Sequence, residues 1–285
     1  MKEIIYARYD NHDGISFNNT LSPIPTRFPT ESHNHIEILY LVSGKIQYLI
    51  DGHSYNLLPG EVIIINSGEI HSLTIDPTIP YHRLNLHFSK NFIPIFRKLN
   101  LFHAFENTKL YHHILPQTLV KESAIYHILK KISSLCLQKA KYQDAKIVCL
   151  IQDLVIEINT VVDNLIANYP HLIPVSTQIN PYILSAINYI NSNLTKNLTI
   201  SSIASFIGLA EEYFQRLFKK TMGVTPAFYI ENQKMQRALS LLRDGHQPKA
   251  IATMLGFDYY ATFYNKFKRI FNVSPSQIIS SQTTS

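Results

Sequence analysis

The sequence contains few of the residues that would point to a secreted, disulfide-stabilised or membrane-spanning protein. Its two cysteines, Cys136 and Cys149, are too few and too far apart for a disulfide framework or a cysteine zinc site. No apolar run approaches the roughly 20 residues that span a bilayer, and the longest strongly aliphatic stretch is VIIIN from Val62. The opening residues, MKEIIYARYD, have charges where a signal peptide needs an apolar core. We therefore expect a cytoplasmic protein with reduced thiols and no membrane partner.

Charge is scarce and unevenly distributed along the chain. Only 16% of the residues are charged and 46% are hydrophobic, which is the composition of an ordinary globular protein. A chain of 285 residues is long enough for two domains. The net charge of +6 lies in the last third, because residues 1–180 contain 15 basic and 15 acidic side chains whereas 181–285 contain 11 and 5. A basic domain joined to a neutral one indicates a polyanionic partner for the basic part.

One short motif of basic and aromatic residues occurs twice in this last third. LFKKTMGVTP begins at Leu217, and KFKRIFNVSP begins at Lys266. Upstream of each lies a second matching pair, IASFIGL from Ile203 and IATMLGF from Ile251. Each copy is typical of a short helix, a glycine turn and a second helix, because a residue without Cβ enters left-handed conformations at little cost. The sequence predicts two helix-turn-helix units, at about 200–220 and 248–270.

Apolar and polar residues separate onto opposite faces of the second helix of each unit. Phe214 and Phe218 in the first unit, and Phe263 and Phe267 in the second, are spaced four apart and are expected to face the core. The outer faces then carry Glu212, Gln215, Arg216 and Lys219 in the first unit, and Ala261, Tyr264, Asn265 and Lys268 in the second.

A connector helix is predicted between the two units. Thr225 before Pro226 is a helix-start pattern and Asp244-Gly245 is a stop, which gives a helix over 226–243. Such a helix would be a rod of about 27 Å. It can hold the second helices of the two units at a separation close to the ~34 Å repeat of major grooves on one face of B-DNA. A solenoid is the alternative for duplicated helical hairpins, but solenoids need about three repeats and lack basic outer faces.

Residues 181–280 resemble the DNA-binding domain of the AraC/XylS family of bacterial transcription regulators. The resemblance lies in IASFIGLAEEYFQRLFKKTMGVTPAFYI, QRALSLL and IATMLGFDYYATFYNKFKRIFNVSP. It implies an all-α domain of about seven helices over 181–285, whose two recognition helices enter neighbouring major grooves of double-stranded DNA. Carried over by position, the base-facing residues are Glu212, Gln215, Arg216, Ala261, Tyr264 and Asn265. The phosphate-facing residues are Lys219, Lys220, Lys268 and Arg269.

The first 110 residues have a sequence pattern typical of short β-strands. Short runs are separated by the turn signals Ser43-Gly44, Asp51-Gly52, Pro59-Gly60 and Ser67-Gly68. Asp-Gly between two apolar runs is a strong hairpin signal, and closely spaced short strands predict a sandwich or barrel. The stretches HNHIEILYLVSG, DGHSYNLLPGE and INSGEIH resemble the cupin barrel that serves this regulator family as a sensor. We expect an α+β fold class, with an all-β cupin-type barrel and flanking helices over 1–119.

Metal-dependent cupins carry a His-x-His pair, a glutamate and a later histidine, and this chain keeps that pattern only in part. His33, Glu37 and His71 stand at matching positions, but Glu31 occupies the place of the first histidine. Two imidazoles and a carboxylate can bind iron or zinc. The broken motif favours a polar effector pocket with no metal or other cofactor. The predicted effector-binding residues are His33, Glu37, Tyr48 and His71.

Two more histidines, His82 and His87, lie in the run YHRLNLHF. Their odd-numbered spacing places them on opposite faces of one strand. At least one of them is expected to be a surface histidine.

The segments KESAIYHILKKISSLCLQKA and AKIVCLIQDLVIEINTVVDNLIANY predict two helices over 120–169. The second helix is so apolar that its apolar surface is expected to be larger than a single barrel can cover. Family members dimerise through helices at this place, so a homodimer is expected. The alternative is that both helices pack wholly on their own barrel. Residues 170–180 contain two prolines and no glycine, which is typical of a stiff linker.

Together these features predict a non-enzymatic, sequence-specific DNA-binding transcription regulator. An effector in the barrel, a sugar or related metabolite by the weight of the family, would change how the linker and dimer helices present the two units. Activation by contact with RNA polymerase is the commoner family role, and repression is the alternative. Two other classes stay open: a metal-dependent cupin enzyme with a helical appendage, and an architectural DNA-binding protein with a ligand-free barrel.

Overall fold

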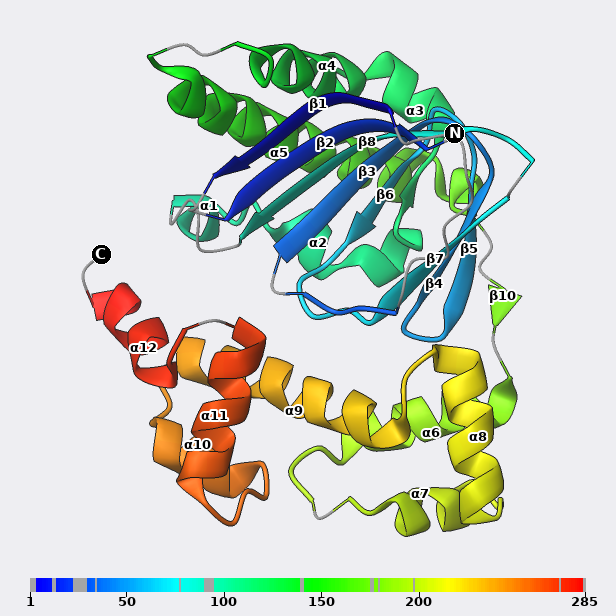
Figure 1. The fold of residues 1–285 in the computed structure, drawn as a ribbon, viewed down its shortest axis with the longest axis vertical. Helices are drawn as coiled ribbons and strands as arrows, with labels where there is room; N and C mark the ends of the chain where they lie inside the picture. The colour runs from blue at the N-terminus through cyan, green and yellow to red at the C-terminus, as the bar shows by residue number, and fades with distance from the viewer. Residues whose placement is uncertain are drawn as a thin grey trace.

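The computed structural model describes residues 4–11, 14–22, 30–33, 35–76, 78–89, 95–138, 141–174, 177–178, 180–196, 198–271 and 273–283. Strands with flanking helices come first in the chain and a helical domain follows, so the predicted α+β fold class is confirmed (Figure 1). Among the described residues, no helix combines the length and apolar character needed to cross a bilayer.

The strands form two antiparallel sheets. In the first, the order is β1 (Ile4–Asn11), β2 (Ile15–Ser22), β8 (Tyr81–Ser89), β3 (His35–Ser43), β6 (Val62–Ile65) and β9 (Ile114–Leu115). In the second, it is β10 (Thr177–Gln178), β5 (His53–Leu57), β4 (Ile46–Ile50) and β7 (His71–Ile75). The sheets share a buried core that includes Leu39, Leu41, Tyr48, Leu57, Ile63 and Leu73. We call this two-sheet unit the barrel.

The predicted Asp51-Gly52 hairpin joins β4 to β5. Both residues have positive φ, 42° and 88°, which is the geometry of a tight two-residue turn that matches the twist of paired strands. The segment predicted as a linker also meets the barrel, because it contains the helix η2 (Pro170–Leu172) and the strand β10, which pairs with β5.

Helices cover the outer face of the six-stranded sheet (Figure 1). They are α1 (Ile95–Lys98), α2 (His103–Glu106), η1 (Thr108–Tyr111), α3 (Gln117–Glu122), α4 (Ile125–Leu135) and α5 (Gln143–Asn168). Ile151, Val155 and Ile158 of α5 are buried in one core with Phe17 and Leu86 of the sheet. Most of the apolar surface of α5 is therefore covered within the chain, and Ile156 is a large apolar side chain that stays exposed.

Seven helices make up the second domain within its described residues: α6 (Pro181–Ser192), α7 (Ile200–Phe206), α8 (Glu211–Met222), α9 (Pro226–Arg243), α10 (Pro248–Met254), α11 (Tyr260–Phe271) and α12 (Pro275–Thr283). They form two small cores. Tyr229 and Ile230 at the start of α9 belong to the core of α6–α8, whereas Met235 and Leu239 belong to the core of α10–α12. The helix α9 thus joins two separately packed units (Figure 1).

Candidate functional site

The first helix-turn-helix unit consists of α7, a glycine turn and α8. Thr199 Oγ1 accepts the Ser202 N–H at 3.0 Å and Ser202 Oγ accepts the Thr199 N–H at 3.2 Å, which is a reciprocal cap at the start of α7. Gly208 has φ +72°, so the turn requires a residue that tolerates the left-handed region. Phe214 and Phe218 are buried, and α8 turns its other side to solvent.

The second unit repeats this arrangement with α10 and α11. Phe263 and Phe267 are buried in its core. The connector holds it in place, because Lys234 Nζ of α9 donates a hydrogen bond of 2.7 Å to the Leu255 carbonyl at the end of α10. A cation there satisfies a helix carbonyl that has no intrahelical partner.

The connector α9 also binds α11 through charge. Thr225 Oγ1 accepts the Phe228 N–H at 3.2 Å and caps the start of α9 ahead of Pro226. One turn further on, the Glu231 carboxylate pairs with Lys266 and Arg269 of α11. These contacts fix the orientation of the second recognition helix against the connector.

Five of the six predicted base-facing residues are exposed, namely Glu212, Gln215, Arg216, Ala261 and Asn265. The sixth, Tyr264, is half-buried, and its ring centroid lies 6.2 Å from that of Tyr260. Tyr259 directly precedes α11 and is 74% exposed.

Lys219, Lys220 and Lys268, which are predicted to meet phosphates, are all exposed. Arg269 differs from them because its side chain, although 68% exposed, is engaged by Glu231. The sequence gives no local signal for this pair, since the two residues are far apart in the chain and belong to different helices.

In the barrel, three histidines converge on one oxygen of Glu37. Glu37 on β3 lies directly opposite His87 on β8, and its Oε2 is 3.4 Å from His87 Nε2. The same oxygen is 3.3 Å from His33 Nε2 and 3.4 Å from His71 Nε2. The structure therefore places two of the predicted effector residues, His33 and His71, beside a third, Glu37, and it adds His87, which sequence reasoning did not place in the site.

The other Glu37 oxygen, Oε1, accepts hydrogen bonds from Tyr48 Oη at 3.3 Å and Asn85 Nδ2 at 3.2 Å. Asn85 and His87 are two residues apart on β8 and so share a face; this spacing is the sequence signal that could have identified them. His82 lies on the other face of the strand, with its Nε2 2.8 Å from Asn19 Oδ1.

The cluster is electrostatically coupled. Burial alone would raise the pKa of Glu37, but its contacts with His33, His71 and His87 outweigh burial and hold that pKa well below its usual value. Burial would likewise lower the pKa of His71, yet the adjacent Glu37 carboxylate raises it to about 9.

Two small cavities flank the cluster. One, of about 190 Å³, is lined by Glu37, Tyr48, His71 and Arg83 among others. The other, of about 290 Å³, is lined by His33 and His87 with residues of β1 and β2. Both are smaller than the roughly 300–1,000 Å³ typical of sites for organic ligands.

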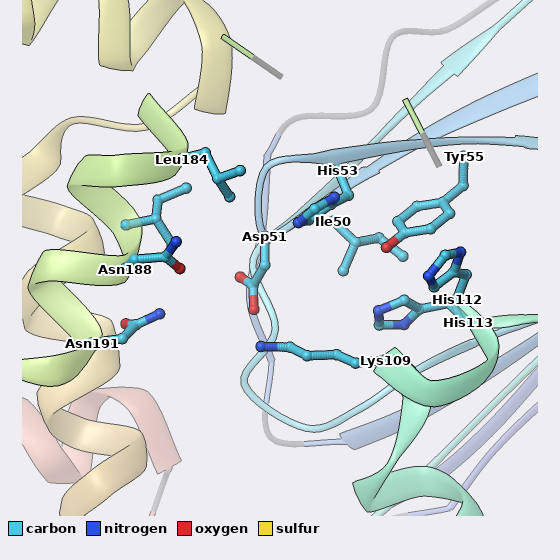
Figure 2. A pocket seen from close by; sticks show the side chains of 11 residues that line it. Ile50, Asp51, His53, Tyr55, Lys109, His112, His113, Leu184, Asn188 and Asn191 are labelled. Atoms are coloured by element: carbon cyan, nitrogen blue, oxygen red, sulfur yellow. The ribbon is translucent and has the colours of Figure 1, made fainter. Parts of the chain in front are cut away.

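A third cavity, of about 360 Å³, lies between the barrel and the helical domain. Figure 2 shows Asp51 and Lys109 on the barrel side of this gap and Asn188 and Asn191 of α6 on the other side. Burial and the nearby charge of Glu69 raise the pKa of Asp51 to about 6. The cavity is polar and is built from both domains.

Beside this cavity the loop before β7 docks on the helical domain. Ile70 is buried in the core of the first helix-turn-helix unit. Asn232 Nδ2 of α9 donates a hydrogen bond of 3.1 Å to the Gly68 carbonyl. Gly68 has φ +88°, a left-handed backbone conformation that favours glycine at this point of the loop.

Sequence relatives match the helical part of the chain. The probable transcriptional regulator LumQ of Photobacterium leiognathi is 31% identical over 91 residues, which cover 32% of this chain and 37% of LumQ. The transposon Tn10 TetD protein of Escherichia coli is 39% identical over 89 residues, which cover 31% of this chain and 64% of TetD. The matched part of the chain thus spans between about a third and two thirds of the length of these relatives.

Solved structures of similar proteins cover either the helical domain or nearly the whole chain. The C-terminal domain of AraT, a response regulator from Geobacillus stearothermophilus, is 27% identical, covers 37% of this chain and 88% of that chain, and has a TM-score of 0.35. ToxT from Vibrio cholerae is 15% identical, covers 95% of this chain and 99% of its own, and has a TM-score of 0.37.

Two family models match consecutive parts of the chain. The AraC-like ligand binding domain matches residues 24–155, which contain the Glu37 cluster. The helix-turn-helix domain matches residues 203–281, which contain α8, the connector and α11. With this sensor-type domain followed by two helix-turn-helix units, the chain belongs to the AraC family of transcription regulators.

Proposed function

We propose that this protein is a sequence-specific DNA-binding transcription regulator that acts as an activator and whose affinity for DNA responds to a small-molecule effector. The observation that carries the proposal is the pair of helix-turn-helix units on one connector helix, each with an exposed polar face. The surplus of basic side chains in 181–285 supports it, because phosphate neutralisation supplies much of the affinity of such proteins for DNA.

The spacing of the two units supports binding to consecutive turns of one duplex. The connector α9 has 18 residues and is therefore about 27 Å long. Its two ends belong to different cores, so α8 and α11 are held apart by a rigid element (Figure 1). In this proposal Arg216 and its exposed neighbours read base edges, while Lys219, Lys220 and Lys268 meet phosphates.

Fluorescence anisotropy with labelled duplexes from the promoter regions beside its own gene tests DNA binding. We expect one duplex to bind at least ten times more tightly than a scrambled duplex of the same composition, with an affinity that falls steeply as salt rises. Equal affinity for all duplexes at every salt concentration and with every effector would contradict sequence-specific binding.

The effector has two candidate positions. The first is the barrel cluster, where Glu37, Tyr48 and His71 line one cavity and His33 lines the other. The interdomain cavity is larger, and a molecule bound there would touch Lys109 of the barrel and Asn191 of α6 at once. A thermal-shift screen with sugars and metabolites finds the effector, because a bound ligand stabilises the folded state by mass action.

Two variants then locate the effector. An effector in the barrel loses its stabilisation in Tyr48→Phe, and one in the interdomain cavity loses it in Lys109→Gln. Each variant is the control for the other. An effector response that survives both changes would exclude both positions.

The assembly and the cellular context belong to the same proposal. We propose a homodimer formed through the helical segment 120–169, where Ile156 of α5 is exposed. Light scattering on the wild type and on Ile156→Glu tests this, since a dimer that depends on that face dissociates in the variant. The proposed setting is the cytoplasm, where the chromosome and RNA polymerase are found.

A metal-dependent cupin enzyme is less well supported, because the chain belongs to a family of regulators. The thermal-shift screen and the anisotropy assay distinguish an architectural DNA-binding protein from an effector-controlled regulator. An architectural protein would bind DNA, but no metabolite would change its stability or its affinity for DNA.

A further inference from the structure

We propose that the barrel contains a binding site for a divalent transition-metal ion, with His33, Glu37 and His87 as its core ligands and His71 as the fourth donor. Three of these ligands, His33, Glu37 and His71, are also predicted effector residues. Only its regulatory consequence rests on the proposed function, because metal binding is measured independently of DNA.

The three distances from Glu37 Oε2 to the histidines match the spacing of ligand atoms in a tetrahedral site. Metal–ligand bonds of about 2.0–2.1 Å place the ligand atoms of such a site about 3.3–3.4 Å apart. Glu37 Oε2 is 3.3 Å from His33 Nε2, 3.4 Å from His71 Nε2 and 3.4 Å from His87 Nε2. The ligand atoms of His33, Glu37 and His87 all lie within 4.8 Å of one another.

Each imidazole is oriented through its other ring nitrogen. His33 Nδ1 lies 3.1 Å from the backbone carbonyl of residue 35, and His71 Nδ1 lies 3.0 Å from that of residue 69. A carbonyl only accepts, so both Nδ1 atoms carry a proton, and the Nε2 atoms are the ones that face the metal ion, which displaces any proton bound to them. His87 Nδ1 is 3.2 Å from Ser16 Oγ. Histidines that bind metals are held in this way by a partner at the second nitrogen.

One donor is buried without a partner. His71 is 3% exposed, and its Nε2 has no hydrogen-bond partner among the described residues, although Glu37 Oε2 is 3.4 Å away. Buried polar atoms without a hydrogen bond are uncommon and require an explanation. A metal ion bound between these donors would give His71 Nε2 a partner.

The donor set selects the class of ion. Imidazole nitrogens with one carboxylate suit zinc, iron, cobalt or nickel, whereas calcium and magnesium prefer oxygen ligands. An ion can reach the site because the His33 and His87 side chains are 22% and 28% exposed. The expectation of no metal rested on Glu31 in place of the first histidine; His87, contributed by β8, supplies the missing imidazole.

Occupancy of the site has a path to the DNA-binding domain. His71 begins β7, and the preceding residue, Ile70, is buried in the core of the first helix-turn-helix unit. A ligand that fixes His71 therefore also restrains the loop that docks on α9.

The test uses the full chain, stripped with a chelator and then titrated with zinc by calorimetry and with cobalt by visible absorption. We expect one ion per chain with a Kd in the micromolar range or tighter, and the ligand-field bands of a four-coordinate cobalt site. His87→Asn and His33→Asn should each weaken zinc binding at least tenfold. His82→Asn is the matched control, because it lies on the opposite face of the same strand and should bind zinc like the wild type.

Circular dichroism of each variant verifies that it is folded. The proposal fails if the folded wild type binds no stoichiometric ion, or if His87→Asn and His82→Asn bind zinc equally well. Anisotropy with and without zinc addresses the regulatory consequence separately. A site that binds zinc without changing DNA affinity would remove that consequence alone, and a chain that binds zinc but no DNA would remove the proposed function.

Discussion

Ile70 and His71 are neighbours in the chain, yet their side chains are buried in different domains. Ile70 is 2% exposed and lies in the core of the first helix-turn-helix unit, whereas His71 is 3% exposed and lies beside Glu37 in the barrel. Successive side chains of an extended segment point to opposite sides. This two-residue segment therefore connects the Glu37 cluster to the first helix-turn-helix unit.

Shortening Ile70 should loosen the contact between the domains. Ile70→Ala removes buried apolar volume and should cost about 2–4 kcal/mol, which appears as faster proteolysis of segment 170–180 and a lower Tm. Ile79→Ala is the matched control, because Ile79 is exposed and its truncation should leave both measurements unchanged. Equal behaviour of the two variants would mean that Ile70 does not hold the domains together.

Reversing one charge on α8 should separate DNA recognition from folding. Arg216 is exposed, so Arg216→Glu should leave Tm within about 2 °C while lowering affinity for the preferred duplex by about 100-fold or more, through lost base contacts and new phosphate repulsion. Lys131→Glu on α4 makes the same charge change at an exposed site of the barrel domain and should bind DNA normally. A comparable loss of Tm in Arg216→Glu would show that Arg216 has a structural role.

The two basic residues at the end of α11 should differ in their effect on salt dependence. Lys268→Gln removes a proposed phosphate contact and should lower the slope of log affinity against log salt by about 1. Arg269→Gln should change the slope less, because Arg269 is already engaged by Glu231, and it should lower Tm by releasing α11 from α9. Equal slopes for the two variants would indicate that the ion pair opens on DNA.

Stability should depend on pH through Glu69. Burial outweighs its hydrogen bonds and raises its pKa from 4.5 to about 7. Because the folded pKa is the higher one, the contribution of this group to stability is present below about pH 4.5 and is lost as pH rises through about 7. Glu69→Gln should therefore raise Tm relative to the wild type at pH 8 and not at pH 4, as measured by thermal unfolding.

Glu61→Gln is the control for that measurement. Glu61 Oε2 accepts the Leu58 N–H at 2.8 Å in an exposed hydrogen bond, whereas Glu69 Oε2 accepts the Asn66 N–H at 2.7 Å in a partly buried one. Burial raises the pKa of Glu61 as well, but without the large shift of Glu69. Its substitution should change the pH dependence much less. A pH profile of Glu69→Gln that parallels the wild type would show that Glu69 ionises freely in the folded protein.

The elements whose signals are local could be predicted from the sequence. The Asp51-Gly52 turn, the paired phenylalanines of α8 and α11, and the proline start of α9 each depend on residues within about four positions. Hydrogen bonding within helices and tight turns has that same short range, so the residues that decide these elements stand close together in the chain.

The partners of the functional side chains depended on the tertiary structure. Strand register places His87 opposite Glu37, and helix packing places Arg269 against Glu231. The docking of the two domains places Ile70 in the core of the first helix-turn-helix unit. Alternation along β8 indicates which residues share a face, but it does not say which strand lies beside it. The sequence alone therefore determined the two helix-turn-helix units and the β-rich domain. Only long-range strand pairing and helix packing decided which charged side chains pair and which histidines lie beside Glu37.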